Sequence, residues 1–149
     1  MVTKSDLETD LKQAMRSSER VRTSTLRMAL SSIKLAEVDK MRELTPEEIM
    51  GILQREVKSR RETIDDAQKA NRPDIIQGAE AELEILSDYL PEPLSEAEIE
   101  TAVRTAIETT GAEALSDMGK VIGAVMAEFG PRAEGKRVSE VARRLLGEV

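Results

Sequence analysis

The sequence predicts an all-α protein, and three observations support this fold class. Apolar residues recur at three- and four-residue spacing along nearly the whole chain, as in helices that bury one face. Aromatic residues make up only 1% of the 149 residues, so the apolar 40% is mainly Leu, Ile, Val, Met and Ala. Such side chains suit packing of helix on helix better than a β-sandwich. No stretch shows a competing strand pattern.

The first two helices are expected at the N-terminus. A short one carries Leu7, Leu11 and Met15 on one face, and a longer one runs from about 20 to 40. The longer helix has an apolar stripe and, on its opposite side, Met28 and Leu35. Because both sides hold apolar residues, we expect neighbours to cover it on both sides.

The third helix has a well-marked start in the sequence TPEE. Thr45 suits the N-cap, Pro46 suits the first helical position, and Glu48 completes a capping box. The helix should run to about residue 70 and end at Asn71, since asparagine tolerates the left-handed conformation that closes many helices. A fourth helix, with Pro73 in its first turn, follows.

Pro91 and Pro93 in YLPEPLSEAE interrupt the helical pattern most clearly, and we place a domain boundary there. The expected domains are an N-terminal four-helix region, residues 1–91, and a small three-helix region, residues 94–149. The three helices of the second region are predicted to begin with a capping box at Ser95, after a cap at Ser116, and after the turn GPRAEG.

Composition excludes several classes of function. The chain has no cysteine and no histidine, which removes disulfides, thiolate nucleophiles, imidazole bases and most zinc or iron sites. The scattered carboxylates show no acid–base geometry, so we expect no catalytic residue, cofactor or metal in this chain. The net charge of −7 argues against general binding to nucleic acids or membranes. No apolar run is long enough to span a membrane and no signal peptide is apparent, so we expect a soluble cytoplasmic protein.

Two glycines lie within the predicted helix after Ser116, and each costs about 1 kcal/mol relative to alanine. Gly119 and Gly123 are four residues apart and therefore share one helix face. Either they allow tight packing inside the C-terminal region, or they leave a bare surface against which another molecule's backbone can lie. The next turn, GPRAEGKRV, sets Arg132, Lys136 and Arg137 beside glycines at a helix start. This turn is either an anion-binding site or simply solvated.

Arg60 stands out among the basic residues because the helical wheel puts it on the apolar stripe of the third helix. A buried arginine needs a carboxylate partner. If the third and fourth helices form an antiparallel hairpin, the partner is expected among Glu80, Glu82 and Glu84. Arg60 is thus a candidate for a buried ion pair or for a ligand contact.

Four segments in colinear order resemble the YqeY family: RTSTLRMALSSIKLAE (22–37), REVKSRRETIDDAQKANRPD (55–74), AEAELEILSDYLPEPLSEAEIE (79–100) and DMGKVIGAVMAEFGPRAEGKRVSE (117–140). This family, also written GatB/YqeY, is related to the C-terminal part of the B subunit of the tRNA-dependent amidotransferases. The resemblance implies an N-terminal helical bundle and a three-helix domain like the amidotransferase tail, which holds the tRNA elbow.

By this resemblance the RNA-facing residues would be Gly119, Lys120, Gly123, Arg132, Gly135, Lys136 and Arg137. The first hypothesis is therefore a non-catalytic, tRNA-associated accessory protein. A second is a component of a carbon–nitrogen ligase with glutamine as amido-N-donor, acting with amidotransferase subunits that supply the missing chemistry. A third is a helical protein-interaction adaptor that binds no RNA.

Overall fold

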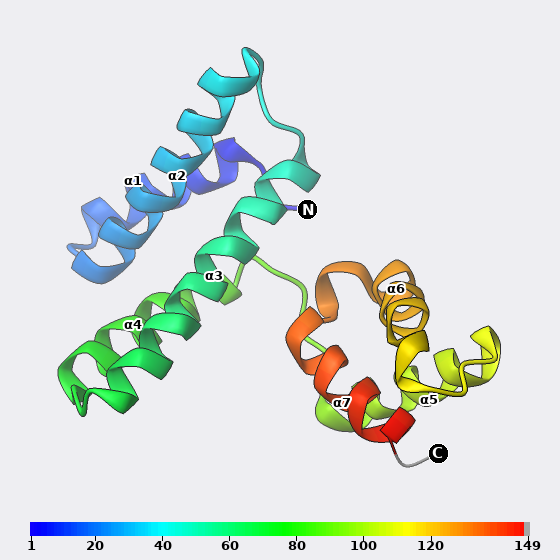
Figure 1. The fold of residues 1–149 in the computed structure, drawn as a ribbon. Coiled ribbons are helices and arrows are strands. Elements are labelled where there is room, and N and C mark those ends of the chain that lie inside the picture. The colour runs from blue at the N-terminus through cyan, green and yellow to red at the C-terminus, as the bar shows by residue number, and fades with distance from the viewer. Residues whose placement is uncertain (148–149) are drawn as a thin grey trace. The chain divides into compact units, whose positions relative to one another are not determined.

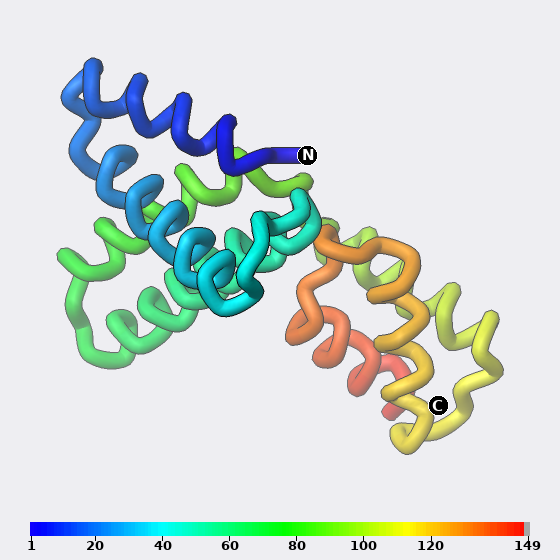
Figure 2. The backbone as a smooth tube through the Cα atoms, turned by 90° about the horizontal axis from the view of Figure 1, so that it is seen from above, coloured from blue at the N-terminus to red at the C-terminus, as the bar shows by residue number. Residues whose placement is uncertain are grey.

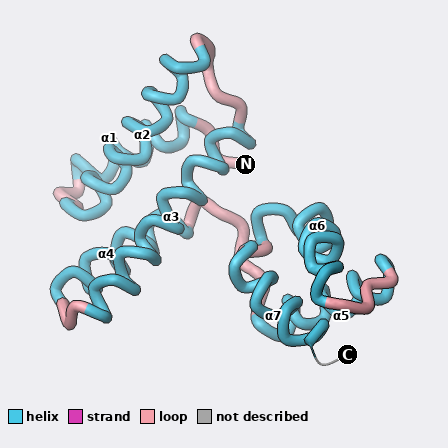
Figure 3. The backbone as a smooth tube through the Cα atoms, in the orientation of Figure 1, coloured by secondary structure: helices cyan, strands magenta, loops and turns pink. Residues whose placement is uncertain are grey.

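The computed structural model describes residues 1–147, and this part of the chain is all-helical, as predicted, with no strand (Figure 3). Its α-helices are α1 Lys4–Arg16, α2 Arg20–Lys40, α3 Pro46–Lys69, α4 Pro73–Ser87, α5 Glu96–Thr110, α6 Met118–Phe129 and α7 Gly135–Gly147. Two short 3-10 turns, η1 Leu115–Asp117 and η2 Gly130–Arg132, flank α6.

The chain folds as two compact units, Met1–Leu90 and Pro91–Val149. The first unit contains α1 to α4 and the second contains α5 to α7 (Figure 1). Each unit has its own cluster of buried apolar side chains.

In the first unit α1 packs along α2, and α3 packs along α4 (Figure 2). The connections within each pair are short, which makes the paired helices antiparallel neighbours. Helix α2 also contacts α3 and α4, and this contact joins the two pairs around one core. The core residues are Leu7, Ala14, Leu26, Ala29, Leu30, Ile33, Ile49, Ile52, Leu53, Val57 and Leu86.

The helix boundaries of this unit follow from local chemistry. The hydroxyl of Thr45 accepts a hydrogen bond from the backbone N–H of Glu48, whose carboxylate accepts from the N–H of Thr45. This capping box starts α3 as predicted. Asn71 has a φ of 53°, the left-handed conformation expected after α3, and Pro73 is the first residue of α4.

The expectation that neighbours cover α2 on both sides is wrong. Leu26, Ala29 and Ile33 are buried, whereas Met28 on the opposite side is 49% exposed and Leu35 is 67% exposed. The buried side of α2 faces α1, α3 and α4, and on the outer side Met28 reaches α3 through the contact of its sulfur with Arg60. The outer face of α2 is therefore apolar and uncovered in the described part of the chain.

In the second unit α5, α6 and α7 contact one another pairwise around a core of Leu, Ile, Val and Ala side chains. Leu94 belongs to this core although it precedes α5. Ser95 caps α5 by accepting a hydrogen bond from the N–H of Glu98, but the two residues do not complete the predicted capping box, because the Glu98 carboxylate accepts from the Ser95 hydroxyl rather than from its backbone N–H. The predicted Ser116 cap of α6 is wrong, because Ser116 lies inside η1. The carboxylate of Asp117 instead accepts from the N–H groups of Glu113 and Ala114 and holds this turn.

Candidate nucleic-acid interface

The two glycines of α6 lie on its outer face. Val121 and Val125 point into the core, and the helical repeat puts Gly119 and Gly123 on the other side of the axis, where both are exposed. Apart from its chain neighbours and the backbone of its own helix, a Cβ atom added to either glycine would meet no atom within 4 Å. Tight packing inside the unit therefore does not explain these glycines, and the remaining interpretation is a bare surface.

The turn between α6 and α7 depends on Gly130. Its φ of 52° and ψ of −125° define a conformation that side chains rarely adopt, so the start of η2 requires glycine. Gly135 then opens α7 with a negative φ and free space around its Cα, so the backbone does not demand glycine there.

Two of the predicted phosphate-binding cations hold the unit itself together. The Nε of Arg132 donates to the carbonyl of Glu92 at 2.9 Å, and Arg137 donates to the carbonyl of Leu94 at 3.2 Å. The N–H of Leu94 in turn donates to the carbonyl of Arg132. These bonds fix the segment before α5 against the α6–α7 turn, so both guanidinium groups are committed to backbone carbonyls.

Lys120 and Lys136 are the more available cations. Lys120 is exposed on the same face as the glycines, and its Nζ lies 3.8 Å from a carboxylate oxygen of Asp117. Lys136 is exposed and makes no hydrogen bond or ion pair with the described residues. They lie in the first turns of different helices, α6 and α7.

The charge around this surface is unfavourable for RNA. Residues 91–149 contain seven basic and eleven acidic residues, a net charge of −4. Any contact with phosphates must therefore rest on individual lysines and on shape, and it should weaken steeply as salt is added.

Arg60 is buried in the first unit, between α3 and its neighbours. Its Nε donates to Glu82 of α4 at 3.0 Å, and a second nitrogen forms an ion pair with Glu56 one turn earlier on α3. A third contact reaches the sulfur of Met28 on α2 at 3.7 Å. The guanidinium thus joins three helices and has little surface left for a ligand.

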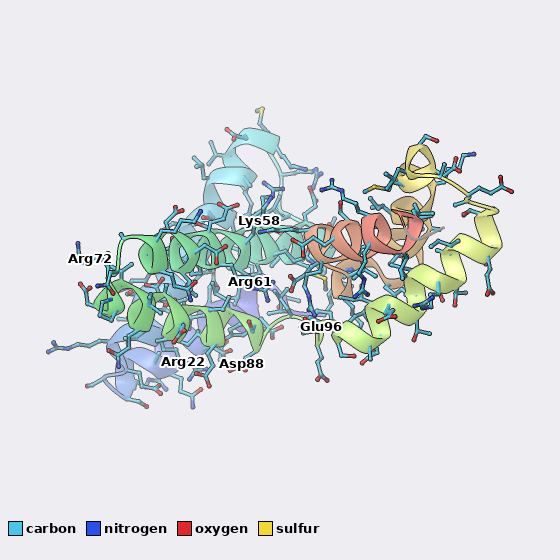
Figure 4. All side chains as sticks on the ribbon, turned by 60° about the horizontal axis from the view of Figure 1, so that its bottom comes forward. Arg22, Lys58, Arg61, Arg72, Asp88 and Glu96 are labelled. Carbon is cyan, nitrogen blue, oxygen red and sulfur yellow. The ribbon has the colours of Figure 1, made fainter. Side chains whose placement is uncertain are left out.

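The first unit also has a surface depression that no local sequence pattern predicted. Asp10, Arg22, Ile85, Asp88 and Tyr89 line an open depression of about 430 Å³, and Figure 4 shows Arg22 and Asp88 near each other. The hydroxyl of Tyr89 donates to Asp10 at 2.6 Å. Burial raises the pKa of Tyr89 to about 12, and the Asp10 carboxylate adds to this rise. The phenol therefore stays protonated at neutral pH and acts as a hydrogen-bond donor.

Neither a membrane span nor a metal cluster occurs among residues 1–147. None of their helices combines the length and hydropathy that crossing a bilayer requires. The same residues contain no group of three or more acidic side chains arranged around a possible ion.

The fold defines a small all-helical protein of two compact units. The sequence model of the Yqey-like protein family matches residues 4–146, and the chain therefore belongs to the YqeY family, as its sequence segments indicated.

Curated relatives support this assignment. The chain is 29% identical over 144 residues to altered inheritance of mitochondria protein 41, mitochondrial, from Pyrenophora tritici-repentis; the match covers 95% of this chain and 79% of that protein. It is 35% identical over 101 residues to the protein of the same name from Lachancea thermotolerans, covering 66% of this chain and 54% of that protein. To the protein of the same name from Vanderwaltozyma polyspora it is 37% identical over 88 residues, covering 56% of this chain and 46% of that protein. The chain thus spans about half the length of the two yeast relatives.

Proposed function

We propose that this protein is a non-catalytic accessory protein that contacts tRNA through its C-terminal unit. The proposal rests mainly on the outer face of α6, where Gly119 and Gly123 are exposed and have open space where a side chain would project. Each glycine costs about 1 kcal/mol of helix stability, and no internal packing offsets that cost. A contact with another molecule's backbone would offset it.

The chemistry of this face suits a sugar–phosphate backbone. Without side chains at Gly119 and Gly123, a ribose or phosphate can approach the helix backbone closely, and Lys120 beside them supplies a positive charge. Family membership adds a reason to expect tRNA, because the family is related to the amidotransferase tail. We extend the proposal to the domains: residues 94–149 would form a tail-like three-helix domain behind an N-terminal four-helix domain, residues 1–91. We also propose a cytoplasmic location, which cell fractionation can test.

The test is a titration of the protein with bulk tRNA at several salt concentrations, with an unrelated structured RNA as control. We expect saturable binding that prefers tRNA and decreases with salt. Lys120→Ala should weaken binding to all RNA sequences. It should also reduce the slope of the logarithm of the binding constant against the logarithm of the salt concentration by about 1, as loss of one phosphate contact does. Arg132 and Arg137 are poor choices for this purpose, because replacing them also loosens the segment before α5.

A bulky side chain tests the glycine face directly. Gly123→Leu should weaken tRNA binding by about tenfold or more, which is 1.4 kcal/mol. Ala97→Leu is the matched control, since Ala97 is exposed on α5 of the same unit. Equal binding by the two variants, or no binding of the wild type at low salt, would refute the proposal.

The ligase hypothesis requires partner subunits, because the chain has no cysteine for glutamine hydrolysis and no phosphate loop. Purified protein with glutamine, ATP and charged tRNA is expected to show no turnover. The net charge of −4 in the C-terminal unit favours the third hypothesis, a protein-interaction adaptor. A protein partner whose binding survives nuclease treatment would support it.

A further inference from the structure

Exposed apolar side chains gather on one part of the first unit. Nine large apolar residues are exposed in the described chain, and six of them lie between residues 15 and 41: Met15, Val21, Met28, Leu35, Val38 and Met41. Met41 is 91% exposed and Val38 is 73% exposed. Such a concentration on a small protein indicates an interaction surface.

The spacing along α2 is that of a helix-pairing seam. Val21, Met28 and Leu35 are seven residues apart, and an exposed residue follows three positions after each of them, in the order Ser24, Ser31 and Val38. A 3-4 repeat of this kind forms a straight stripe into which the side chains of a second helix can pack. Ser24 and Ser31 are small and project less than the apolar side chains beside them.

One edge of the stripe is basic. Arg20, Arg27 and Lys34 are themselves seven residues apart, and all three are exposed. Arg20 and Lys34 make no hydrogen bond or ion pair with the described residues, and Arg27 contacts only the sulfur of Met15, at 3.8 Å. That contact brings Met15 of α1 to the same edge. The nearest acid on α2, Glu37, is already paired with Lys4 and with the N–H of Leu44.

We propose that the outer face of α2, together with Met15, binds an amphipathic partner helix with an apolar stripe and acidic residues along one edge. The partner's acids would pair with Arg20, Arg27 and Lys34, and its apolar residues would cover Val21, Met28 and Leu35. Methionine is unbranched and adapts its shape, so Met15 and Met28 on this surface suit the docking of a helix.

Charge and composition favour this occupant over three others. A second copy in antiparallel arrangement would set the two basic edges against each other, which is repulsive. A lipid surface is usually entered by Trp or Phe, and this face has neither. Four exposed Val, Leu and Met side chains along α2 gain nothing from a phosphate backbone.

The test uses two designed peptides of about three heptads, each with Leu along its apolar stripe. One has Glu and the other Lys at the positions that border the stripe. Each labelled peptide is titrated with the full chain and followed by fluorescence anisotropy. The Glu peptide is expected to bind saturably, and the Lys peptide about tenfold more weakly or not at all. Lys34→Glu should reduce this preference.

Matched variants locate the binding. Leu35→Gln should weaken binding of the Glu peptide by about tenfold, the effect of losing one well-placed apolar anchor. Leu115→Gln removes a comparably exposed leucine from the second unit and should change nothing. Both replaced residues are exposed, and circular dichroism checks that each variant is folded. The proposal fails if neither peptide binds, if both bind alike, or if the two variants behave identically. If the protein dimerises and Leu35→Gln abolishes the dimer, the face binds a second copy of the chain. If the protein sediments with anionic vesicles and Leu35→Gln prevents this, the face binds lipid. Either result overturns the proposal.

Discussion

Replacing Arg60 with methionine should destabilise the first unit substantially, although no ligand or surface is involved. The Arg60 side chain is 7% exposed and pairs with Glu56 and Glu82. Methionine keeps most of the apolar stem and removes the charge. Removing one partner of a buried ion pair typically costs 3–5 kcal/mol, because the other charge is left without compensation. Here Glu56 and Glu82 keep 20% and 30% of their side-chain surface in water, so we expect about 2–3 kcal/mol.

The assay can follow this unit separately. The chain has one tyrosine and no tryptophan, and Tyr89 belongs to the unit Met1–Leu90. Tyrosine fluorescence during urea unfolding therefore reports on this unit, whereas far-ultraviolet circular dichroism reports on both. With an m-value of about 1 kcal/mol per M urea, the midpoint should fall by about 2 M or more. Arg55→Met is the control, because Arg55 is exposed on the same helix and makes no ion pair or hydrogen bond with the described residues.

A combined variant separates stranded charge from lost packing. Adding Glu56→Gln and Glu82→Gln to Arg60→Met removes the unpaired charges and should recover most of the lost stability. An Arg60→Met midpoint equal to that of Arg55→Met would refute the reasoning. Loss without recovery in the combined variant would show that packing of the arginine stem, rather than its charge, stabilises the unit.

Three further predictions concern single groups of the first unit. Hydrogen bonds led by that from Arg42 hold the pKa of Glu48 far below its usual 4.5, so this carboxylate stabilises the fold above that pH and the contribution disappears as the pH falls through the lowered pKa. The urea midpoint of unfolding, measured over a pH series, should therefore fall less with decreasing pH in Glu48→Gln than in the wild type. The hydroxyl of Thr25 is buried with no hydrogen-bond partner in the described structure, and Thr25→Val should raise stability by about 1 kcal/mol; a lower melting temperature would contradict this. Tyr89, with its pKa near 12 rather than 10.0, should form tyrosinate late in an alkaline titration, and its stabilising effect should be lost as the pH rises through 12. Asp10→Asn should lower this pKa, as tyrosinate absorbance would report.

The sequence predicted the parts of the fold that depend on neighbouring residues. The capping box at Thr45, the left-handed Asn71 and the all-helical class each follow from residues a few positions apart. Residue periodicity also indicated both apolar sides of α2, but it cannot distinguish the side that the fold covers. That choice depends on where α3 and α4 pack, and the buried side holds Leu26 and Ile33 while Leu35 remains exposed.

The candidate sites are built from contacts between residues that lie far apart in the sequence, and such contacts could not be predicted. Arg132 reaches a carbonyl 40 residues earlier and Tyr89 reaches a carboxylate 79 residues earlier, and no local pattern encodes either contact. For Arg60, the helical wheel predicted that the arginine is buried. It did not predict that Glu56, on the same helix, is one of its partners. Likewise, the spacing of Gly119 and Gly123 predicted a shared face, and only the structure showed that this face is empty.

The two proposed surfaces lie in different units, so their tests can be crossed. Leu35 belongs to Met1–Leu90 and Lys120 to Pro91–Val149. If each surface binds its own partner, Leu35→Gln should leave tRNA binding unchanged and Lys120→Ala should leave binding of the acidic peptide unchanged. Adding the peptide should also leave the tRNA affinity unchanged, because independent sites have no coupling free energy; by reciprocity, adding tRNA should then leave the peptide affinity unchanged. Independent binding at both surfaces would make the protein a bridge that carries a helical partner to an RNA, and this would reconcile the accessory and adaptor hypotheses.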